Sequence, residues 1–557
     1  MLKRDPHRAP HLVARRVVAT LRILMVALLI CGLTLTVPQS SSAQSRASSF
    51  INSGTVTFVT GGGVADLDPA SIVTAAANVA VTANTAETLV AYKGSNVTAF
   101  VPLLATSWSS NANKSVWTFH LRHGVPFHTG RCCMTATDVT YSIARTVLAG
   151  LAGAYIFGRY MTHPLTQITA LDPYTVRFTL GRPQYTFINA IASKNAGLIL
   201  DASAVKAHAT KGDPWAHNWV TNHDTGTGPY VLQTWQRNVQ ETLVRFPRYW
   251  GGWNGRHFST VLMREIPEAG TRRELLERGQ ADLTFGLTPQ DALALQSNSK
   301  VTVTAPYGTE IDYIAMNESG PLASPLARRA LSYAFNYDAF LVAAFHGYAK
   351  RGYGPLASIL QGYDPRVFHY HTDLATAKSL LQQAHVAPGT TLTYMYVTGY
   401  PAERTEGLIL QAQLAQIGIS LKLQGVSQAT QGSVLFGALP ANRRPNLMAY
   451  AWWPDYNDSW DESVVLLASS SAGAAGANIG YYHNKQVDAL LADMKYASPE
   501  TLTRDARTLQ DITSRVDPPA IWTAEPAQVT IQTRTLRGYV FNPLDVQVYS
   551  FYPMSRA

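Results

Sequence analysis

The stretch VWTFHLRHGVPFHTG, residues 116–130, decides how this sequence is interpreted. Residues 116–121 are rich in β-branched and aromatic side chains, which predicts a strand, and the glycines and proline of 124–130 predict a loop. Residues 134–148 follow with apolar positions at helical spacing and either Thr135 or Thr137 as the N-terminal cap, which predicts a helix. The order is therefore strand, loop, helix.

Strands and helices alternate on both sides of this stretch. The patterns predict strands at 55–60, 174–181, 240–246, 312–317, 391–397, 420–426, 445–453 and 528–533. They predict helices at 76–92, 324–345, 375–386, 404–419, 485–497 and 501–516. Such alternation is typical of α/β domains with mixed sheets.

The N-terminus has the features of an export signal. A basic leader precedes an apolar run from Ile23 to Val37, and a small-residue stretch then offers a cleavage site after Ala43. The run is shorter than the roughly 20 apolar residues of a membrane span. Arg15 and Arg16 leave the twin-arginine route open beside the general one. Lipid anchoring at Cys31 is not expected, because Ile30 is large where a lipoprotein signal needs a small residue.

Net charge and chain length limit which class of protein this sequence can encode. The formal net charge of +9 falls to +4 once residues 1–43 are removed, because they hold six Lys/Arg and one Asp/Glu. No basic block remains, so we do not expect nucleic-acid binding. About 510 residues exceed what one core holds, and two or three domains are expected. Apart from Cys31, the cysteines are Cys132 and Cys133, read as two ordinary side chains with a vicinal disulfide as the alternative.

The sequence lacks the usual catalytic motifs. It has no G-x-S-x-G elbow, no H-E-x-x-H helix, no Walker loop and no G-x-G-x-x-G after a strand. His120 and His123 would face opposite sides of a strand, and His128 follows a turn. A metal ion needs convergent ligands, so neither a metal site nor a cofactor is expected. A secreted hydrolase stays open only as a minor alternative.

One further stretch, AWWPDYND at residues 451–458, sets two indoles against two carboxylates. It ends a strand-like run, and ligands in α/β sheets bind beyond the carboxyl ends of strands. It is read either as a turn leaving the core or as a recognition pocket with aromatic walls and an acid for a cation. Local sequence leaves both readings open.

Several segments together resemble one family. They are, in order, LDPA (67–70), VPLLATSW (101–108), VWTFHLRHGVPFHTG (116–130), GTGPYVLQTW (226–235), RFPRYWGG (245–252), LLERGQADLTFGLTP (275–289) and LARRALSYAFNYDAF (326–340). The chain resembles the extracytoplasmic solute-binding proteins of the peptide/nickel ABC importers, solute-binding family 5. The likeness spans nearly all of the chain after residue 43.

This resemblance implies an α/β fold of the type II periplasmic-binding-protein class, a two-lobed clamp with mixed sheets and an extra inserted domain. The first lobe would comprise residues 44–90, 225–306 and 526–557. Residues 91–224 would be its insert, and 307–525 the second lobe. Such proteins close on a ligand by a hinge motion and deliver it to a membrane permease, and they are not enzymes.

The resemblance also implies a site. Trp452 and Asp455 match a pattern of peptide binders, a tryptophan, two variable residues and an aspartate, in which the aspartate pairs with the ligand's α-ammonium. Trp452 and Trp453, the latter at a variable position, would supply a wall of the pocket. Tyr313 and Asn317 flank the start of the second lobe near the expected cleft. Ala449 stands where some oligopeptide binders carry an arginine for the ligand's carboxylate, so peptide length stays open.

The resulting expectation is a periplasmic or extracytoplasmic monomer that binds peptides and hands them to a permease. A metal chelate, an opine or an oligosaccharide is the alternative ligand. Trp108, Trp117, Trp235 and Trp250 are expected to pack in the core, and Arg328 and Arg329 to lie on a solvated helix face.

Overall fold

The computed structural model describes residues 54–71, 76–473, 476–544 and 548–557. The predicted signal segment, residues 1–43, lies outside them. Within the described ranges, no helix combines the length and apolarity that crossing a membrane requires.

The first sheet is mixed and has seven strands. Their order is β12 (Val301–Thr304), β19 (Thr530–Thr533), β11 (Leu283–Phe285), β1 (Thr55–Thr60), β10 (Thr260–Glu265), β9 (Gln240–Arg245) and β8 (Tyr230–Gln236). β1 is parallel to β10 and β11, and the other neighbours are antiparallel. β1 alternates faces: Phe58 packs toward residues 549–554, while Val59 packs toward α8 (Ala269–Glu277) and α9 (Pro289–Leu295). Helix α1 (Ala76–Thr85) lies on the Phe58 side.

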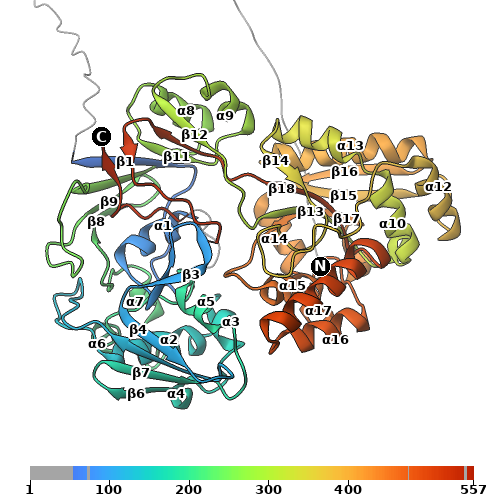
Figure 1. The fold of residues 1–557 in the computed structure, drawn as a ribbon. Coiled ribbons are helices and arrows are strands. Elements are labelled where there is room, and N and C mark those ends of the chain that lie inside the picture. The colour runs from blue at the N-terminus through green and yellow to red at the C-terminus, as the bar shows by residue number, and fades with distance from the viewer. Residues whose placement is uncertain (1–53, 72–75, 474–475, 545–547) are drawn as a thin grey trace, which may run out of the picture. The chain divides into compact units, whose positions relative to one another are not determined.

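The second sheet has six strands and helices on both faces (Figure 1). Its order is β14 (Ala349–Arg351), β18 (Ala520–Pro526), β13 (Ile311–Met316), β17 (Leu447–Trp452), β15 (Thr391–Val397) and β16 (Ser420–Val426). One face packs against α10 (Pro325–Ala334), α12 (Leu374–Gln383) and α13 (Pro401–Gln416). The other packs against α15 (Ser459–Leu467), α16 (Lys485–Met494) and α17 (Pro499–Asp511).

A third, antiparallel sheet lies within residues 91–224. It has the order β4 (Ala105–Ser110), β5 (Val116–Leu121), β7 (Thr175–Thr179) and β6 (Ile168–Asp172), and α2 (Ala136–Leu148) packs on it. The strand predicted at 116–121 is β5, and Thr135 is the cap of α2. Short elements complete this part: β2 (Val90–Lys93), β3 (Asn96–Pro102), α3 (Ala154–Gly158), α4 (Pro164–Gln167), α5 (Phe187–Ala192), α6 (Ala202–Ala207) and α7 (His217–Val220).

The assignment of residues to a first lobe, an insert and a second lobe stays a prediction. The remaining α-helices and strands are α11 (Tyr337–Phe340), α14 (Gln428–Phe436), β20 (Leu536–Arg537) and β21 (Ser555–Arg556).

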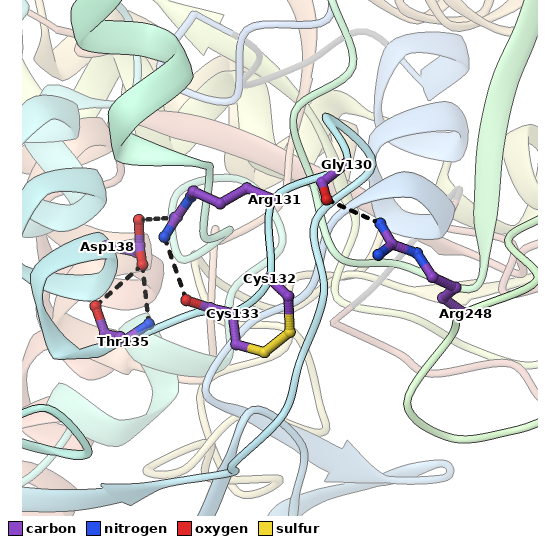
Figure 2. Close-up of a disulfide and its surroundings, with 7 residues drawn as sticks. All are labelled: Gly130, Arg131, Cys132, Cys133, Thr135, Asp138 and Arg248. Atoms are coloured by element: carbon purple, nitrogen blue, oxygen red, sulfur yellow. Dashed lines mark hydrogen bonds and ion pairs between the residues drawn. A yellow bond between two sulfur atoms is a disulfide. The ribbon is translucent and has the colours of Figure 1, made fainter.

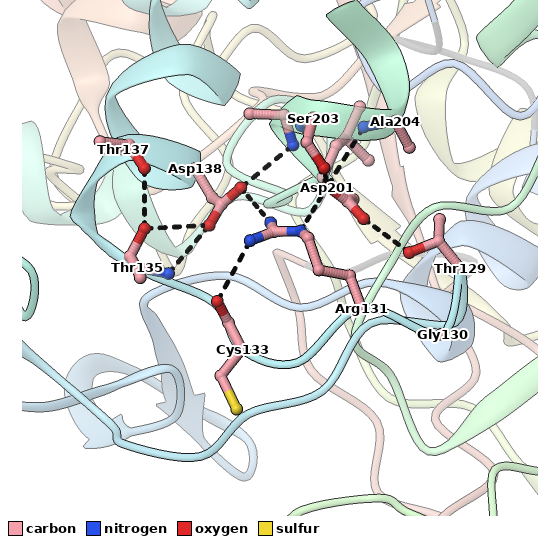
Figure 3. Close-up of polar contacts among 12 residues, drawn as sticks. Thr129, Gly130, Arg131, Cys133, Thr135, Thr137, Asp138, Asp201, Ser203 and Ala204 are labelled. Carbon is pink, nitrogen blue, oxygen red and sulfur yellow. Dashed lines mark hydrogen bonds and ion pairs between the residues drawn. The ribbon is translucent and has the colours of Figure 1, made fainter. Parts of the chain in front are cut away.

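Cys132 and Cys133 are joined by a disulfide, which was the alternative reading of the sequence (Figure 2). Their loop is held by Arg131, which donates to Asp201 at 2.8 Å, to the Cys133 carbonyl at 3.2 Å and to Asp138 (Figure 3). Thr129 adds a 2.6 Å hydrogen bond to Asp201. Ion pairs therefore fix the loop independently of the disulfide.

Other sequence predictions are wrong in detail. The helix expected at 324–345 ends at Ala334, because Phe335 is extended and the Asn336 side chain caps a new helix by accepting from the Ala339 N–H at 3.0 Å. Arg328 is 1% exposed and does not lie on a solvated face. Its guanidinium pairs with Glu318 at 2.7 Å and with Asp517, and donates to the Pro518 carbonyl at 3.0 Å. A charge can be buried there because it is fully paired.

Candidate functional site

The stretch AWWPDYND forms the end of β17 and the turn into α15. β17 runs antiparallel to β13, so Trp452 lies opposite Ile311 and Tyr450 opposite Tyr313. Alternate residues of a strand share a face, which puts Tyr450, Trp452 and Tyr313 on the same side of the sheet. Asp458 caps α15, since its carboxylate accepts from the Trp460 N–H at 2.9 Å. We call residues 453–458 the acidic turn.

Asp455 is the partly exposed carboxylate of the acidic turn, and residues from the 91–224 segment surround it. The Tyr155 hydroxyl donates to its carboxylate, and the Asn195 amide lies 3.5 Å from it. The Ser193 hydroxyl donates to the Asp455 carbonyl at 3.2 Å. The Asp455 N–H donates to the Asp461 carboxylate at 3.2 Å. Asp455 is thus held both by the 91–224 segment and by Asp461. A cation could bind its carboxylate beside the Tyr155 hydroxyl or in place of it.

The electrostatics of the turn favour binding of a positive group. Burial raises the pKa of Asp455 to about 6, against the lowering effect of Tyr155 and Asn195. Burial and the Asp455 charge raise the pKa of Asp461 well above its usual range. In the part of the chain that is described, no Lys, Arg or His forms an ion pair with either residue. A cation would relieve this excess of acid.

Arg159 is close by but committed elsewhere. Its guanidinium pairs with Asp458 at 2.7 Å, donates to the Tyr456 hydroxyl at 2.7 Å and lies over the Trp460 ring at 3.8 Å. Thr186 also donates to Asp458 at 2.9 Å. Asp458 is therefore neutralised by the protein, whereas Asp455 is not.

The predicted wall residues lie near this turn. Tyr313 is 3% exposed, packs beside Tyr450 and Trp522, and has a hydroxyl without a partner among the described residues. Trp452 and Trp453 are both partly buried, and the buried Trp452 indole N–H likewise has no partner there. Trp452 thus ends β17, Trp453 and Asp455 follow it in the acidic turn, and Tyr313 lies on the same face of the sheet as Trp452.

Asn317 lies elsewhere. It follows the end of β13 that pairs with Leu447, about 20 Å from the end that pairs with Trp452 at 3.3 Å per residue. Its side chain is fully buried and donates to the carbonyls of Ala441 at 2.8 Å and Pro445 at 3.2 Å. The predicted ligand contact of Asn317 stays a prediction.

The three histidines of residues 116–130 lie in three separate environments. His128 lies between Asp224 at 2.8 Å and the Gly228 carbonyl at 2.9 Å, where it holds two loops together. His123 stacks on Tyr174, and His120 lies 3.4 Å from the Thr175 hydroxyl. Among the described residues, no cluster of three or more His, Cys, Asp or Glu is arranged to hold a metal ion.

Comparison with known proteins identifies the family. Residues 99–474 match the model of bacterial extracellular solute-binding proteins, family 5, middle part. The chain belongs to this family. Its members are binding proteins that work outside the cytoplasm, as the resemblance implied.

Individual relatives of this family align along most of their length. The probable D,D-dipeptide-binding periplasmic protein DdpA of Escherichia coli K12 is 29% identical over 456 residues, covering 81% of this chain and 84% of that protein. Di/tripeptide-binding protein 2 of Pseudomonas aeruginosa is 25% identical over 474 residues, covering 81% and 86%.

The fold agrees as well. The periplasmic binding protein DppA of Helicobacter pylori, solved with the peptide STSA, superposes with a TM-score of 0.77 at 25% identity over 90% of this chain and 98% of that one. A dipeptide-binding protein from Pseudoalteromonas, solved with Met-Leu, gives the same TM-score at 20% identity and shares the fold. The predicted two-lobed α/β clamp is confirmed.

Sequence reasoning missed the residues around Asp455. Tyr155 and Asn195 are 300 and 260 residues away in the chain, and no local pattern could have found them. Asp461 and Glu462 are different, because they stand in the first turn of α15 within DSWDES. Two acids there are ordinary for a helix N-terminus, so their burial was not visible in the sequence.

Proposed function

We propose that this protein captures peptides outside the cytoplasm and delivers them to the permease of an ABC importer, with Asp455 as the anchor of the ligand's α-ammonium. The observation that carries the proposal is the Asp455 carboxylate, which lies beyond the end of β17 beside Trp452 and Trp453 and has no cationic partner in the described structure. A carboxylate in such a place binds a cation far more strongly than one on an open surface.

The proposal also includes the export signal, the oligomeric state and the absence of turnover. Residues 1–43 serve as the export signal, the protein works as a monomer, and it neither binds nucleic acid nor turns its ligand over. Relatives solved with agropinic acid and with Ni(L-His) have the same fold, so a different solute is the alternative. Trp452, Trp453 and Tyr313 form the wall of the site.

A double-mutant cycle tests the anchor. Isothermal titration would measure a free-amine tripeptide and its N-acetylated form against the parent protein and Asp455→Ala. Truncating a charge partner costs about 2–5 kcal/mol, so the free-amine peptide should lose roughly 30-fold or more in affinity. The acetylated peptide should bind poorly to both proteins. Additive effects without a coupling energy would remove Asp455 as the anchor.

Mass spectrometry of peptides incubated with the protein separates binder from hydrolase. Intact peptides after prolonged incubation are expected. Ligand carried through purification, identified in the same way, distinguishes a peptide from another solute.

A further inference from the structure

The accessible surface beside the anchor continues from Trp452 back along β17. Trp452, Tyr450 and Met448 alternate along this strand and lie on one face of the sheet. Met448 is 0% exposed, whereas Tyr450 and Trp452 are only half-buried. The accessible part of this face therefore begins at the acidic turn and ends at Tyr450.

The parallel strands β15 and β17 separate at the same edge of the sheet. Among the residues described they share two paired positions, the later of which joins Met395 to Met448. Beyond that point the Gln431 side chain of α14 donates to the Ala449 carbonyl at 3.0 Å, where a strand partner would otherwise donate. Ligands in α/β sheets bind in a crevice beyond the carboxyl ends of strands, and α14 lies beside such an end.

The last residue of α14, Phe436, extends the accessible surface with a second aromatic ring. Its ring meets the Tyr450 ring edge-on, with the centroids 5.8 Å apart, and it stays 39% exposed with the whole chain present. We call Trp452, Tyr450 and Phe436 the aromatic patch. All three belong to the second sheet and its helices, as does Asp455. An exposed apolar surface that adjoins a polar anchor is typical of a ligand-binding groove.

The spacing along the aromatic patch matches that of an extended peptide. Trp452 and Tyr450 are two residues apart on a strand, so their Cα atoms lie about 7 Å apart. Alternate side chains of an extended ligand have the same separation and point to the same side. A ligand anchored at Asp455 and lying along β17 would set its first side chain against Trp452. Its third side chain would then meet Tyr450 and Phe436.

We propose that Phe436 and Tyr450 form a subsite for the third side chain of the peptide and select an aromatic or large aliphatic residue there. This inference rests on the proposed function, because it needs a peptide anchored at Asp455. It goes further by naming the position along the peptide at which the protein discriminates and the residues that do so. A third aromatic ring can pack edge-to-face against these two, which is the geometry that aromatic rings prefer.

Two isomeric tripeptides test the subsite. Ala-Ala-Phe and Ala-Phe-Ala have the same composition, length and charges, and differ only in the position that carries the phenyl ring. Isothermal titration should show that the parent protein binds Ala-Ala-Phe about tenfold more tightly, because only this isomer places its ring on Tyr450 and Phe436. The heat-capacity change on binding should also be more negative for Ala-Ala-Phe, since more apolar surface is buried.

Phe436→Ala should remove the preference and leave the affinity for Ala-Phe-Ala within about twofold. The matched control is Leu408→Ala. Leu408 is 40% exposed, nearly the same as Phe436, but it belongs to α13, which packs against the opposite face of the sheet. This variant should keep the full preference. The preference is a ratio measured on one protein, so partial unfolding of a variant would weaken both isomers equally and leave the ratio unchanged.

The dipeptide Ala-Phe separates failure of the subsite from failure of the proposed function. If Ala-Phe and both tripeptides fail to bind the parent protein, peptide binding is wrong and the subsite falls with it. If Ala-Phe binds and neither tripeptide does, the subsite is wrong and peptide binding stands. The same conclusion follows if the two isomers bind with equal affinity, or if Phe436→Ala keeps the preference for Ala-Ala-Phe.

Discussion

At the scale of single residues, the protonation of Asp455 should govern affinity. Its pKa in the free protein is about 6, and only the ionised form can pair with an ammonium. Affinity for a peptide should therefore be constant near pH 7 and fall by about tenfold per pH unit below pH 6. Asp461 and Glu462 keep their protons more firmly, because their pKa values are raised further, while Tyr155 and Arg159 do not titrate there. Titration calorimetry from pH 5 to pH 8 measures the effect.

Asp455→Asn is the control for this pH dependence. It keeps the shape of the side chain and the hydrogen bond from Tyr155 but cannot ionise. Its weaker affinity should be nearly flat between pH 5 and pH 7. A parent protein whose affinity does not change between pH 7 and pH 5 would contradict the anchor role.

Single residues also show where sequence reasoning stops. The pattern around Trp452, Trp453 and Asp455 pointed to the turn that the structure places beyond β17. It could not find Tyr155, because only the tertiary fold brings residues 155 and 455 together. Arg328 was misread for a related reason, since its partners Glu318 and Asp517 belong to other elements.

At the scale of elements, α13 and the N-terminal end of β13 hold an unusual group of acids. Burial raises the pKa of Glu406 to about 8 and that of Glu403 to about 7. Asp312 and Glu310 of the neighbouring strand region also have raised pKa values. None of the four has an ion-pair partner within the described residues. The folded protein therefore holds protons here that the unfolded chain would release.

Glu406→Gln should show this in stability. A carboxyl whose folded pKa exceeds its unfolded pKa stabilises the fold at low pH, and the stability is lost as pH rises through the folded value. The window here runs from about pH 4.5 to about pH 8. Glutamine cannot ionise but still accepts from the Tyr394 hydroxyl, which lies 2.8 Å from Glu406. The variant should melt about 2 °C or more above the parent at pH 8, as about 1 kcal/mol implies, and within about 1 °C of it at pH 5.

Scanning calorimetry at the two pH values checks this expectation. Glu277→Gln is a suitable control, because Glu277 is a surface acid that pairs with Arg273 on the same helix. An equal gain for Glu406→Gln at both pH values would mean that the carboxyl is not titrating in this window.

The disulfide loop should be dispensable for binding. Cys132 and Cys133 lie in the loop that Arg131 holds to Asp201 and Asp138. The residues of the 91–224 segment that contact Asp455 are different ones: Tyr155, Ser193 and Asn195. A bond between adjacent residues closes almost no loop and so constrains the unfolded chain very little. Replacing both cysteines with serine should leave peptide affinity within a few-fold. A hundredfold loss, about 2.7 kcal/mol, would contradict this.

Elements with strong periodicity were predictable and junctions were not. The strands at 55–60 and 116–121 were predicted with the bounds that β1 and β5 have. The long helix expected after Pro325 breaks at Phe335, because a side-chain cap from Asn336 outweighs a continuous apolar pattern. The helix expected over 76–92 ends at Thr85, since residues 90–93 pair with β3. In both cases a local hydrogen bond or a tertiary pairing overrides periodicity.

At the scale of the whole molecule, the connections of the second lobe suit a hinge. The predicted second lobe, residues 307–525, would be one continuous span, and the two segments that connect it to the rest of the chain run side by side: Tyr307 bridges Ala527, and the Gln528 N–H donates to the Pro306 carbonyl at 2.8 Å. Two adjacent extended segments allow rotation with little loss of packing. Saturating peptide should reduce the radius of gyration measured by solution scattering. An unchanged radius, with binding verified independently, would count against closure.

Arg159 should control that closure. Its buried ion pair with Asp458 joins the 91–224 segment to the 307–525 span, with side chains 6% and 1% exposed. Removing one partner of a buried pair costs about 3–5 kcal/mol in the state that buries it, because the other charge is left uncompensated.

When the lobes separate, water can solvate Asp458, so Arg159→Met should destabilise the closed state more than the open state. The peptide-bound variant should have a larger radius than the bound parent and a weaker affinity, while both free proteins scatter alike. Arg122→Met is the matched control, because Arg122 also lies over a tryptophan, Trp250 at 3.9 Å, but both residues lie outside the 307–525 span. Closure of Arg159→Met to the radius of the bound parent would show that the ion pair only packs the interface and does not hold it shut.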